Sequence, residues 1–116
     1  MDPALESLTA ALRRFAADRD WDQFHSPKNL AAALSVEAAE LLEHFQWLTE
    51  DQSRNLAPDQ RSAVGRELAD VFLYLLQIAD KLQIDLVAAA QQKLELNASK
   101  YPVALARGSS RKYSEL

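Results

Sequence analysis

Residues 67–76 read Glu-Leu-Ala-Asp-Val-Phe-Leu-Tyr-Leu-Leu and carry more information about the fold than any other part of the chain. Residues 71–76 are all apolar or aromatic, so in a helix they would cover every side. A helix that is apolar all round must be buried all round, and a bundle of 116 residues has little room for that. We therefore expect a second subunit to cover the outer face of this helix. A central helix within one bundle is the alternative.

Proline and apolar spacing extend the helical pattern outward from this stretch. Pro58 suits a first helical position, and apolar residues recur every three or four positions from Val64 to Leu82. The same criteria predict four helices, over residues 3–18, 26–49, 58–83 and 85–100. Between and after them we expect a polar joint over 19–26, a loop over 50–57 and an extended tail over 103–116. With two glycines and four prolines, the sequence predicts an all-α four-helix bundle that forms one domain over residues 1–116.

The composition excludes several classes of protein. There is no cysteine, which removes disulfides, thiolate metal sites and cysteine nucleophiles, and two histidines are too few for a histidine-rich zinc site. The net charge is −4 and the pI about 5.1, so we expect no binding to nucleic acid or to an anionic membrane. No apolar stretch approaches the ~20 residues that span a bilayer. Asp2 and Glu6 lie where a signal peptide would be basic and apolar, so the expected location is the cytoplasm.

Two acidic pairs are the most informative feature for function. Glu37 and Glu40 lie in the second predicted helix, Glu67 and Asp70 lie in the third, and each pair is spaced i, i+3. At about 100° per residue the members of a pair lie about 60° apart, so they share one face of the helix. Each pair borders the apolar row of its helix. If the two rows pack together as antiparallel neighbours, the four carboxylates converge at the rim of the core.

Converging carboxylates need a compensating charge. Their mutual repulsion is on the order of several kcal/mol at an intermediate dielectric, so some would be protonated unless a cation is bound. Oxygen ligands favour Mg²⁺, with Mn²⁺ as a substitute. Solvated acids on two helix faces are the alternative, and the pattern alone does not decide between them. Glu43 continues the series but falls away from the apolar row, so we interpret it as a surface acid.

A basic segment follows the acidic one. Residues 37–53 hold five acids and no lysine or arginine, whereas residues 93–113 hold five bases and one acid. Metal ions beside bases suit a polyphosphate substrate, because both neutralise phosphate oxygens. Lys93, Asn97 and Lys100 share one face of the fourth predicted helix. A solvated face at the negative end of the helix dipole is the alternative.

Aromatic side chains lie near both ends of the second predicted helix. Trp21, Phe24 and His25 precede this helix, and Trp47 lies at its end. Such residues commonly cover a core. The functional interpretation is a pocket in which a nucleobase stacks between their rings.

Taken in order, these strings resemble a known family. The chain has Trp21-Asp-Gln-Phe-His-Ser-Pro-Lys-Asn-Leu, then Glu37-x-x-Glu40, Phe45-Gln-Trp47 and Glu67-x-x-Asp70. This order is similar to that of the all-α nucleoside triphosphate pyrophosphohydrolases, the MazG-like superfamily, whose signature is Glu-x-x-Glu, a spacer and Glu-x-x-Asp. The tail, with Tyr101-Pro, Ala106-Arg and Ser109-Ser-Arg-Lys-Tyr, resembles the dCTP pyrophosphatase branch.

The resemblance implies Mg²⁺-dependent hydrolysis of a (deoxy)nucleoside triphosphate, above all dCTP and base-modified dCTP, to the monophosphate and pyrophosphate. It implies a homotetramer. By matching position, the metal ligands and catalytic acids are Glu37, Glu40, Glu67 and Asp70. The implied positions around the base are Trp21, His25 and Trp47, those around the phosphates are Lys93, Asn97 and Tyr101, and further pocket candidates are Lys28, Asn29 and Tyr74.

Two classes of function stay open from the sequence. The first is a pyrophosphohydrolase that cleans the nucleotide pool, with dCTP or a broader range of nucleotides as substrate. The second is a non-catalytic helical interaction module. The intact set of four acids favours the enzyme, because a binding module has no reason to keep carboxylates that repel one another.

Overall fold

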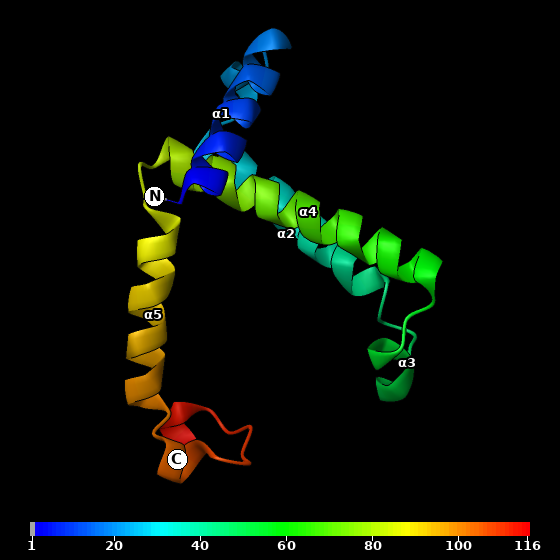
Figure 1. Cartoon of the computed structure of the whole chain (residues 1–116), viewed down its shortest axis with the longest axis vertical. Coiled ribbons are helices and arrows are strands. Elements are labelled where there is room, and N and C mark those ends of the chain that lie inside the picture. The colour runs from blue at the N-terminus through cyan, green and yellow to red at the C-terminus, as the bar shows by residue number, and fades with distance from the viewer. Residues whose placement is uncertain (1) are drawn as a thin grey trace. The chain divides into compact units, whose positions relative to one another are not determined.

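The computed structural model of the protein describes residues 2–116, and within that range it contains helices and turns but no strand. Figure 1 shows the elements in chain order: α1 (Pro3–Asp18), the 3-10 turn η1 (Asp22–Phe24), α2 (Pro27–Glu43), α3 (Glu50–Arg54), α4 (Pro58–Lys81), α5 (Leu86–Lys100), α6 (Val103–Ala106) and the 3-10 turn η2 (Tyr113–Glu115). The all-α class predicted from the sequence is confirmed. The three prolines at positions 3, 27 and 58 each begin a long helix, as their fixed φ favours.

The second helix is shorter than predicted, because it ends in a tighter turn and a separate helix, α3, follows it. The prediction ran to about Thr49, but α2 ends at Glu43, where the His44 N–H donates to the Leu41 oxygen at 3.2 Å in a three-residue turn. Thr49 then caps α3: its hydroxyl accepts from the Gln52 N–H at 3.2 Å, and the Gln52 side chain accepts from the Thr49 N–H at 2.9 Å. This capping box explains why the predicted loop over 50–57 contains a helix.

The C-terminal segment also differs from its prediction. Residues 103–116 were expected to be extended, but α6 follows directly after Pro102, and η2 forms near the end. The Ala106 N–H donates to the Pro102 oxygen at 2.9 Å, which closes one helical turn. Gly108 follows with a φ of +74°, a left-handed conformation that glycine adopts without strain. The prediction missed both elements because four residues and three residues are too few to leave an apolar periodicity in the sequence.

The contacts divide the chain into two compact units. One is Pro3–Ile84 and the other is Asp85–Leu116 together with Asp2. Within the first unit, α2 and α4 run antiparallel side by side and α1 packs on α4 (Figure 1). Its core is small and consists of Ala16, Leu30, Val64, Leu76 and Ala79, each less than a tenth exposed.

Two helices of the first unit end in the same way. Asp20 and Gln83 take left-handed φ angles of 53° and 56°, just past the ends of α1 and α4. The Trp21 N–H then reaches back to the Ala16 oxygen at 2.9 Å, and the Ile84 N–H reaches the Ala79 oxygen at 2.9 Å. These are Schellman-type ends, which satisfy the last carbonyls and fix the direction in which the chain leaves each helix.

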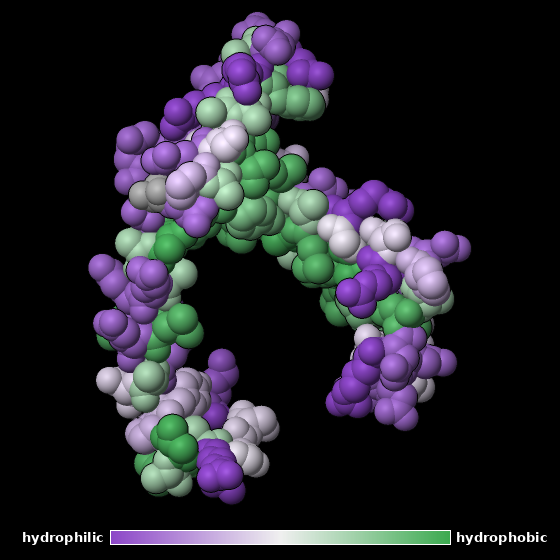
Figure 2. All heavy atoms as spheres, in the orientation of Figure 1, coloured by the Kyte–Doolittle hydropathy of each residue, from purple (hydrophilic) through white to green (hydrophobic). Residues whose placement is uncertain are grey.

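Large apolar side chains lie open at the surface of both units. In the 71–76 run, Leu76 is buried, but Phe72 and Leu75 are 38% and 37% exposed. Figure 2 shows apolar residues along the α2 and α4 pair at the surface of the first unit. In the second unit Leu94 is 69% exposed and Val103 is 76% exposed. Across residues 2–116, no helix is long and apolar enough to cross a membrane.

Candidate active site

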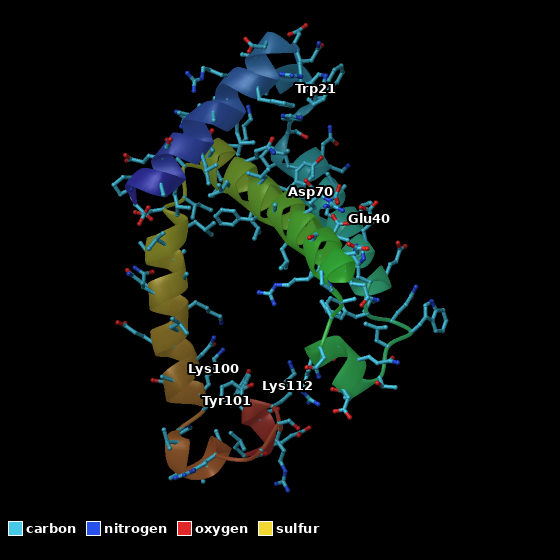
Figure 3. All side chains as sticks on the ribbon, turned by 45° about the vertical axis from the view of Figure 1, so that its right-hand side comes forward. Trp21, Glu40, Asp70, Lys100, Tyr101 and Lys112 are labelled. Atoms are coloured by element: carbon cyan, nitrogen blue, oxygen red, sulfur yellow. The ribbon has the colours of Figure 1, made fainter. Side chains whose placement is uncertain are left out.

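The acidic pairs meet where α2 and α4 pack side by side. One carboxylate oxygen from each of Glu37, Glu67 and Asp70 lies within 4.8 Å of those of the other two. The i, i+3 spacing puts Glu67 and Asp70 on one face of α4, and the antiparallel packing brings Glu37 of α2 opposite them. Figure 3 shows Glu40 and Asp70 on these two neighbouring helices. Three of the four acids expected to converge therefore form one cluster.

This cluster is partly buried and has unsatisfied oxygen atoms. Glu67 is only 9% exposed, an unusual burial for an acid. The Oε2 atoms of Glu37 and Glu67 are both buried without a hydrogen-bond partner. Burying a charged oxygen without a partner destabilises the folded state, so a proton or a bound cation at these two atoms would stabilise it.

The protonation of Glu37 responds to this crowding. Its pKa is raised above the ordinary value of 4.5, first because a proton on Glu37 allows a hydrogen bond to Glu67, and second because burial disfavours the charged form. The negative charges of Glu67 and Asp70 raise the pKa further, whereas a hydrogen bond from Glu40 lowers it. The cluster therefore holds more negative charge than the protein itself compensates. Glu40, half-buried on α2, lies close enough to act on the Glu37 carboxyl.

The donor set fits a hard divalent cation. All its ligand atoms are carboxylate oxygens from two packed helices, and such oxygens are the ligands that Mg²⁺ and Mn²⁺ prefer. A cation at this place would satisfy the two unpartnered oxygens and remove the need for the proton on Glu37. Of the four acids predicted to converge, three do so, and their binding of a metal ion stays a prediction.

A cavity of about 400 Å³ opens beside the acidic cluster. Among the residues predicted to bind substrate, Trp21, His25 and Tyr74 line it, and Asp70 lines it as well. The Trp21 ring packs edge-on against Phe15 at 5.7 Å and against His25 at 6.3 Å between ring centroids. The cavity has a predominantly apolar and aromatic wall, which suits a flat ring such as a nucleobase.

The sequence analysis missed the contribution of α1 to this cavity. Leu8, Leu12 and Phe15 form one wall, and Leu73 and Gln77 of α4 join them. The 3–4 spacing of the α1 residues indicated an apolar face but could not distinguish a face buried in a core from one that lines a cavity. Leu8 and Phe15 are 40% and 46% exposed, so this face is open rather than packed.

Three other predicted residues lie outside the cavity lining. The Asn29 side chain donates to the Phe24 oxygen at 2.9 Å and so joins the first turn of α2 to η1. Lys28 is exposed in the same turn of α2. Trp47 lies beyond the end of α2 with 86% of its surface exposed. Of the pocket residues predicted in the first unit, Trp21, His25 and Tyr74 therefore line the cavity, and the three named here do not.

The predicted phosphate-binding residues lie on the second unit. Lys93 is exposed and Asn97 half-buried on α5, and Tyr101 caps that helix with its N–H on the Asn97 oxygen at 2.9 Å. The Tyr101 ring packs edge-on against Tyr113 at 6.2 Å, and the Lys100 ammonium lies 4.8 Å from the centre of the Tyr113 ring. Figure 3 labels Lys100 and Tyr101 at the end of this helix. The role of these residues with phosphate stays a prediction.

Comparison with known proteins gives consistent results. A sequence model of the MazG-like family matches residues 32–116. The human protein named dCTP pyrophosphatase 1 is 44% identical over 117 residues, which cover 99% of this chain and 69% of that protein. The bovine protein of the same name is 42% identical over the same shares of both chains. The crystal structure of a pyrophosphatase from Archaeoglobus fulgidus superposes with a TM-score of 0.81 at 40% identity, over 88% of this chain and 95% of that one.

Proposed function

The chain belongs to the MazG-like family, and on that premise we propose that it hydrolyses dCTP and base-modified dCTP to the monophosphate and pyrophosphate, and so cleans the nucleotide pool. It is a nucleoside triphosphate pyrophosphohydrolase in this proposal. The observation that carries the proposal is the cluster of Glu37, Glu67 and Asp70, in which two buried oxygens lack any partner within the described chain. Such a cluster is costly for folding and useful for chemistry on a polyphosphate.

The metal of this reaction is Mg²⁺, with Mn²⁺ as a substitute, held by Glu37, Glu40, Glu67 and Asp70. When bound, the cation supplies the charge that offsets the phosphate oxygens and activates water for attack at the α-phosphorus. The carboxylates hold the cation and fix its place, and Glu37 or Glu40 orients the attacking water through a hydrogen bond. No protein nucleophile is needed, which agrees with a chain that has no cysteine.

The base of the nucleotide occupies the aromatic cavity. Asp70 supports this placement because it belongs to the acidic cluster and also lines the cavity. A base held between Trp21, His25 and Tyr74 therefore leaves its phosphates beside the carboxylates. In this proposal Lys93, Asn97 and Tyr101 of the second unit bind phosphate. Lys28, Asn29 and Trp47 do not line the cavity, and their contact with the nucleotide stays a prediction.

The working assembly is a homo-oligomer, in our proposal a homotetramer of four-helix bundles. Its support is the exposure of large apolar side chains, such as Phe72, Leu75 and Leu94, which a second copy would cover. We also propose that residues 1–116 act as one domain, since the matched family segment, residues 32–116, spans both units. The expected location is the cytoplasm, which imaging of a tagged chain would test.

A nucleotide panel tests the proposed function. The purified protein is incubated with Mg²⁺ and each dNTP, each NTP and 5-methyl-dCTP, and the products are separated by ion-exchange chromatography. We expect monophosphate and pyrophosphate, with dCTP converted fastest, and a large loss of activity in Asp70→Asn. The same products with another nucleotide fastest would replace dCTP by a broader substrate range. No turnover with Mg²⁺ or Mn²⁺ would favour the interaction module instead.

A further inference from the structure

The last turn of α4 makes two ion pairs with two different elements. Asp80 pairs with Arg13 of α1, whose Nε donates to Asp80 Oδ2 at 2.9 Å and whose terminal nitrogen contacts the second oxygen. The next residue, Lys81, pairs with Asp22 at the start of η1. Asp80 thus links α4 to α1, and its neighbour Lys81 links α4 to η1.

Two residues that line the aromatic cavity flank the turn η1. Trp21 precedes it and His25 follows it, and both line the cavity. The turn is internally fixed, since the Phe24 N–H donates to the Trp21 oxygen at 2.9 Å and the His25 N–H donates to the Asp22 oxygen at 3.1 Å. Trp21 and His25 must therefore move with Asp22 as one piece. The Trp21 N–H bond to the Ala16 oxygen ties this segment to α1, the Asn29 side chain ties it to α2, and Asp22 ties it to α4 through Lys81.

A second, small cavity lies on the other side of His25. It measures about 30 Å³, and its lining includes Asp22, Asp80 and Lys81. Leu12, Ala16, His25 and Gln77 line both this cavity and the large one. The ion pairs thus lie behind side chains that line both cavities, and His25 is one of them.

We propose that Asp22 and Lys81 form a positioning pair for the nucleotide-binding cavity. By holding η1 to the last turn of α4, the pair fixes Trp21 and His25 at the separation from Tyr74 that a base requires. Neither residue of the pair touches substrate. This inference rests on the proposed function for its substrate, but the position of Trp21 can be measured without one.

The pair contributes to binding more than to stability. The Asp22 side chain is 70% exposed and that of Lys81 is 31% exposed, and ion pairs open to water contribute little to folding. The Asp80 side chain, at 18% exposed, is better shielded in its pair with Arg13. Loss of Asp22–Lys81 should therefore leave the fold intact and loosen only the segment that it holds.

Steady-state kinetics with dCTP test the proposal. Lys81→Met keeps most of the apolar stem of the side chain but removes the charged end, and we expect KM to rise about fivefold with kcat within about twofold of the native value. Asp22→Asn should produce the same change from the other side of the pair. Lys81→Arg restores the ion pair and should return KM to near the native value. Lys81 at a helix end could also act on the helix dipole, but then Asp22→Asn would have no effect.

The matched control is Arg61→Met. It removes one positive charge from the first turn of the same helix, in a side chain exposed to solvent. KM should stay within about twofold of the native value, because no cavity residue depends on this charge. An equal rise of KM in Arg61→Met and Lys81→Met would mean that general attraction of a polyanionic substrate is responsible, and the positioning role would be wrong.

Fluorescence gives a measurement that needs no substrate. The chain has two tryptophans, so Trp47→Phe leaves Trp21 as the sole reporter. In that background we expect Lys81→Met to raise acrylamide quenching of Trp21 about twofold, whereas Lys81→Arg leaves it unchanged. If Lys81→Met does not fold, Asp22→Asn is measured in its place.

The outcomes separate the two proposals. A native protein that converts no nucleotide defeats the proposed function, while the quenching experiment still decides whether the pair positions Trp21. A native protein that is active, with KM and quenching unchanged in both Lys81→Met and Asp22→Asn, overturns the positioning pair alone.

Discussion

Two carboxylates on α4, Glu67 and Asp80, are both largely shielded from solvent, yet their surroundings are opposite. Glu67 faces Glu37 and Asp70, and one of its oxygens has no partner. Asp80 receives two hydrogen bonds from Arg13. The hydrogen bond with Arg13 holds the pKa of Asp80 below its ordinary value of 3.8, whereas the pKa of Glu37 is raised above its ordinary value of 4.5. The negative charge of Asp80 is balanced by Arg13, whereas the acidic cluster around Glu67 has no positive charge beside it among the described residues.

Asp80 has its opposite charge within the protein and stabilises the fold, whereas Glu67 has none and is suited to binding a cation. Residue type does not make this distinction, because both are acids on the same helix. The distinction comes from whether the chain itself supplies the opposite charge. A cluster that the chain leaves uncompensated, beside a cavity of suitable size, is where an external cation and a polyanionic substrate would bind.

The largest expected difference between the two sites is in activity. Glu67→Gln should lower kcat/KM for dCTP by roughly 10³-fold, because it removes the negative charge and one carboxylate oxygen from the metal site while keeping the shape of the side chain. Asp80→Asn should keep activity within about threefold of the native value. Both are measured by pyrophosphate release at saturating Mg²⁺.

The control for this comparison is Glu43→Gln, which removes an exposed acid one turn beyond Glu40 on α2. Its activity should equal that of the native protein. A loss in Glu43→Gln as large as that in Glu67→Gln would show that any acid near this surface matters, and would remove the distinction between the cluster and its surroundings.

A smaller difference should appear in the response of stability to Mg²⁺. Metal that binds only the folded state raises Tm, and for a chain of this size the rise is about 5–10 °C at a hundredfold excess over Kd. We expect this rise in the native protein and in Asp80→Asn, but not in Glu67→Gln. Differential scanning fluorimetry with MgCl₂, against NaCl at equal ionic strength, measures it. An equal rise in all three would place the cation elsewhere.

Much of this site was predictable from the sequence because helical spacing is regular. The i, i+3 pairs fixed which face of each helix the acids share, and the apolar rows indicated that these faces meet. The convergence of Glu37, Glu67 and Asp70 follows from those two facts. The starts of α2 and α4 were predictable for a similar local reason, since Pro27 and Pro58 suit a first helical turn.

The rest depended on contacts between residues far apart in the chain. Asn29 was predicted to lie in the pocket, but its side chain bonds to the Phe24 oxygen, a partner that no spacing rule identifies. The same holds for Asp22 with Lys81, which are 59 positions apart. Leu12 and Phe15 belong to the cavity only because of the angle at which α1 packs on α4. Such angles follow from tertiary packing and not from periodicity.

The smallest expected effect is a pair of opposite pH dependences in the metal-free protein. Glu37 has a raised pKa in the folded state, so its ionisation opposes folding, and Glu37→Gln should be more stable than the native protein at pH 7. This advantage should vanish as the pH falls below 4.5, the ordinary value, where the carboxyl is protonated in both states. Asp80 has a lowered pKa, so its charge favours folding, and Asp80→Asn should be less stable at pH 7. That deficit should shrink only below pH 3.8, as the native carboxylate takes up its proton.

Thermal unfolding in EDTA between pH 3 and pH 7, followed by circular dichroism, measures both differences, each expected to be about 3 °C in Tm at pH 7. Saturating Mg²⁺ then sharpens the comparison. It should reverse the advantage of Glu37→Gln, because the native cluster gains a cation that the variant holds less well, and it should leave the deficit of Asp80→Asn unchanged. A metal-free Glu37→Gln that is less stable than the native protein at pH 7 would mean that the Glu37 carboxylate already has its compensating charge within the chain. The contrast between the acidic cluster and the Asp80 site would then be wrong.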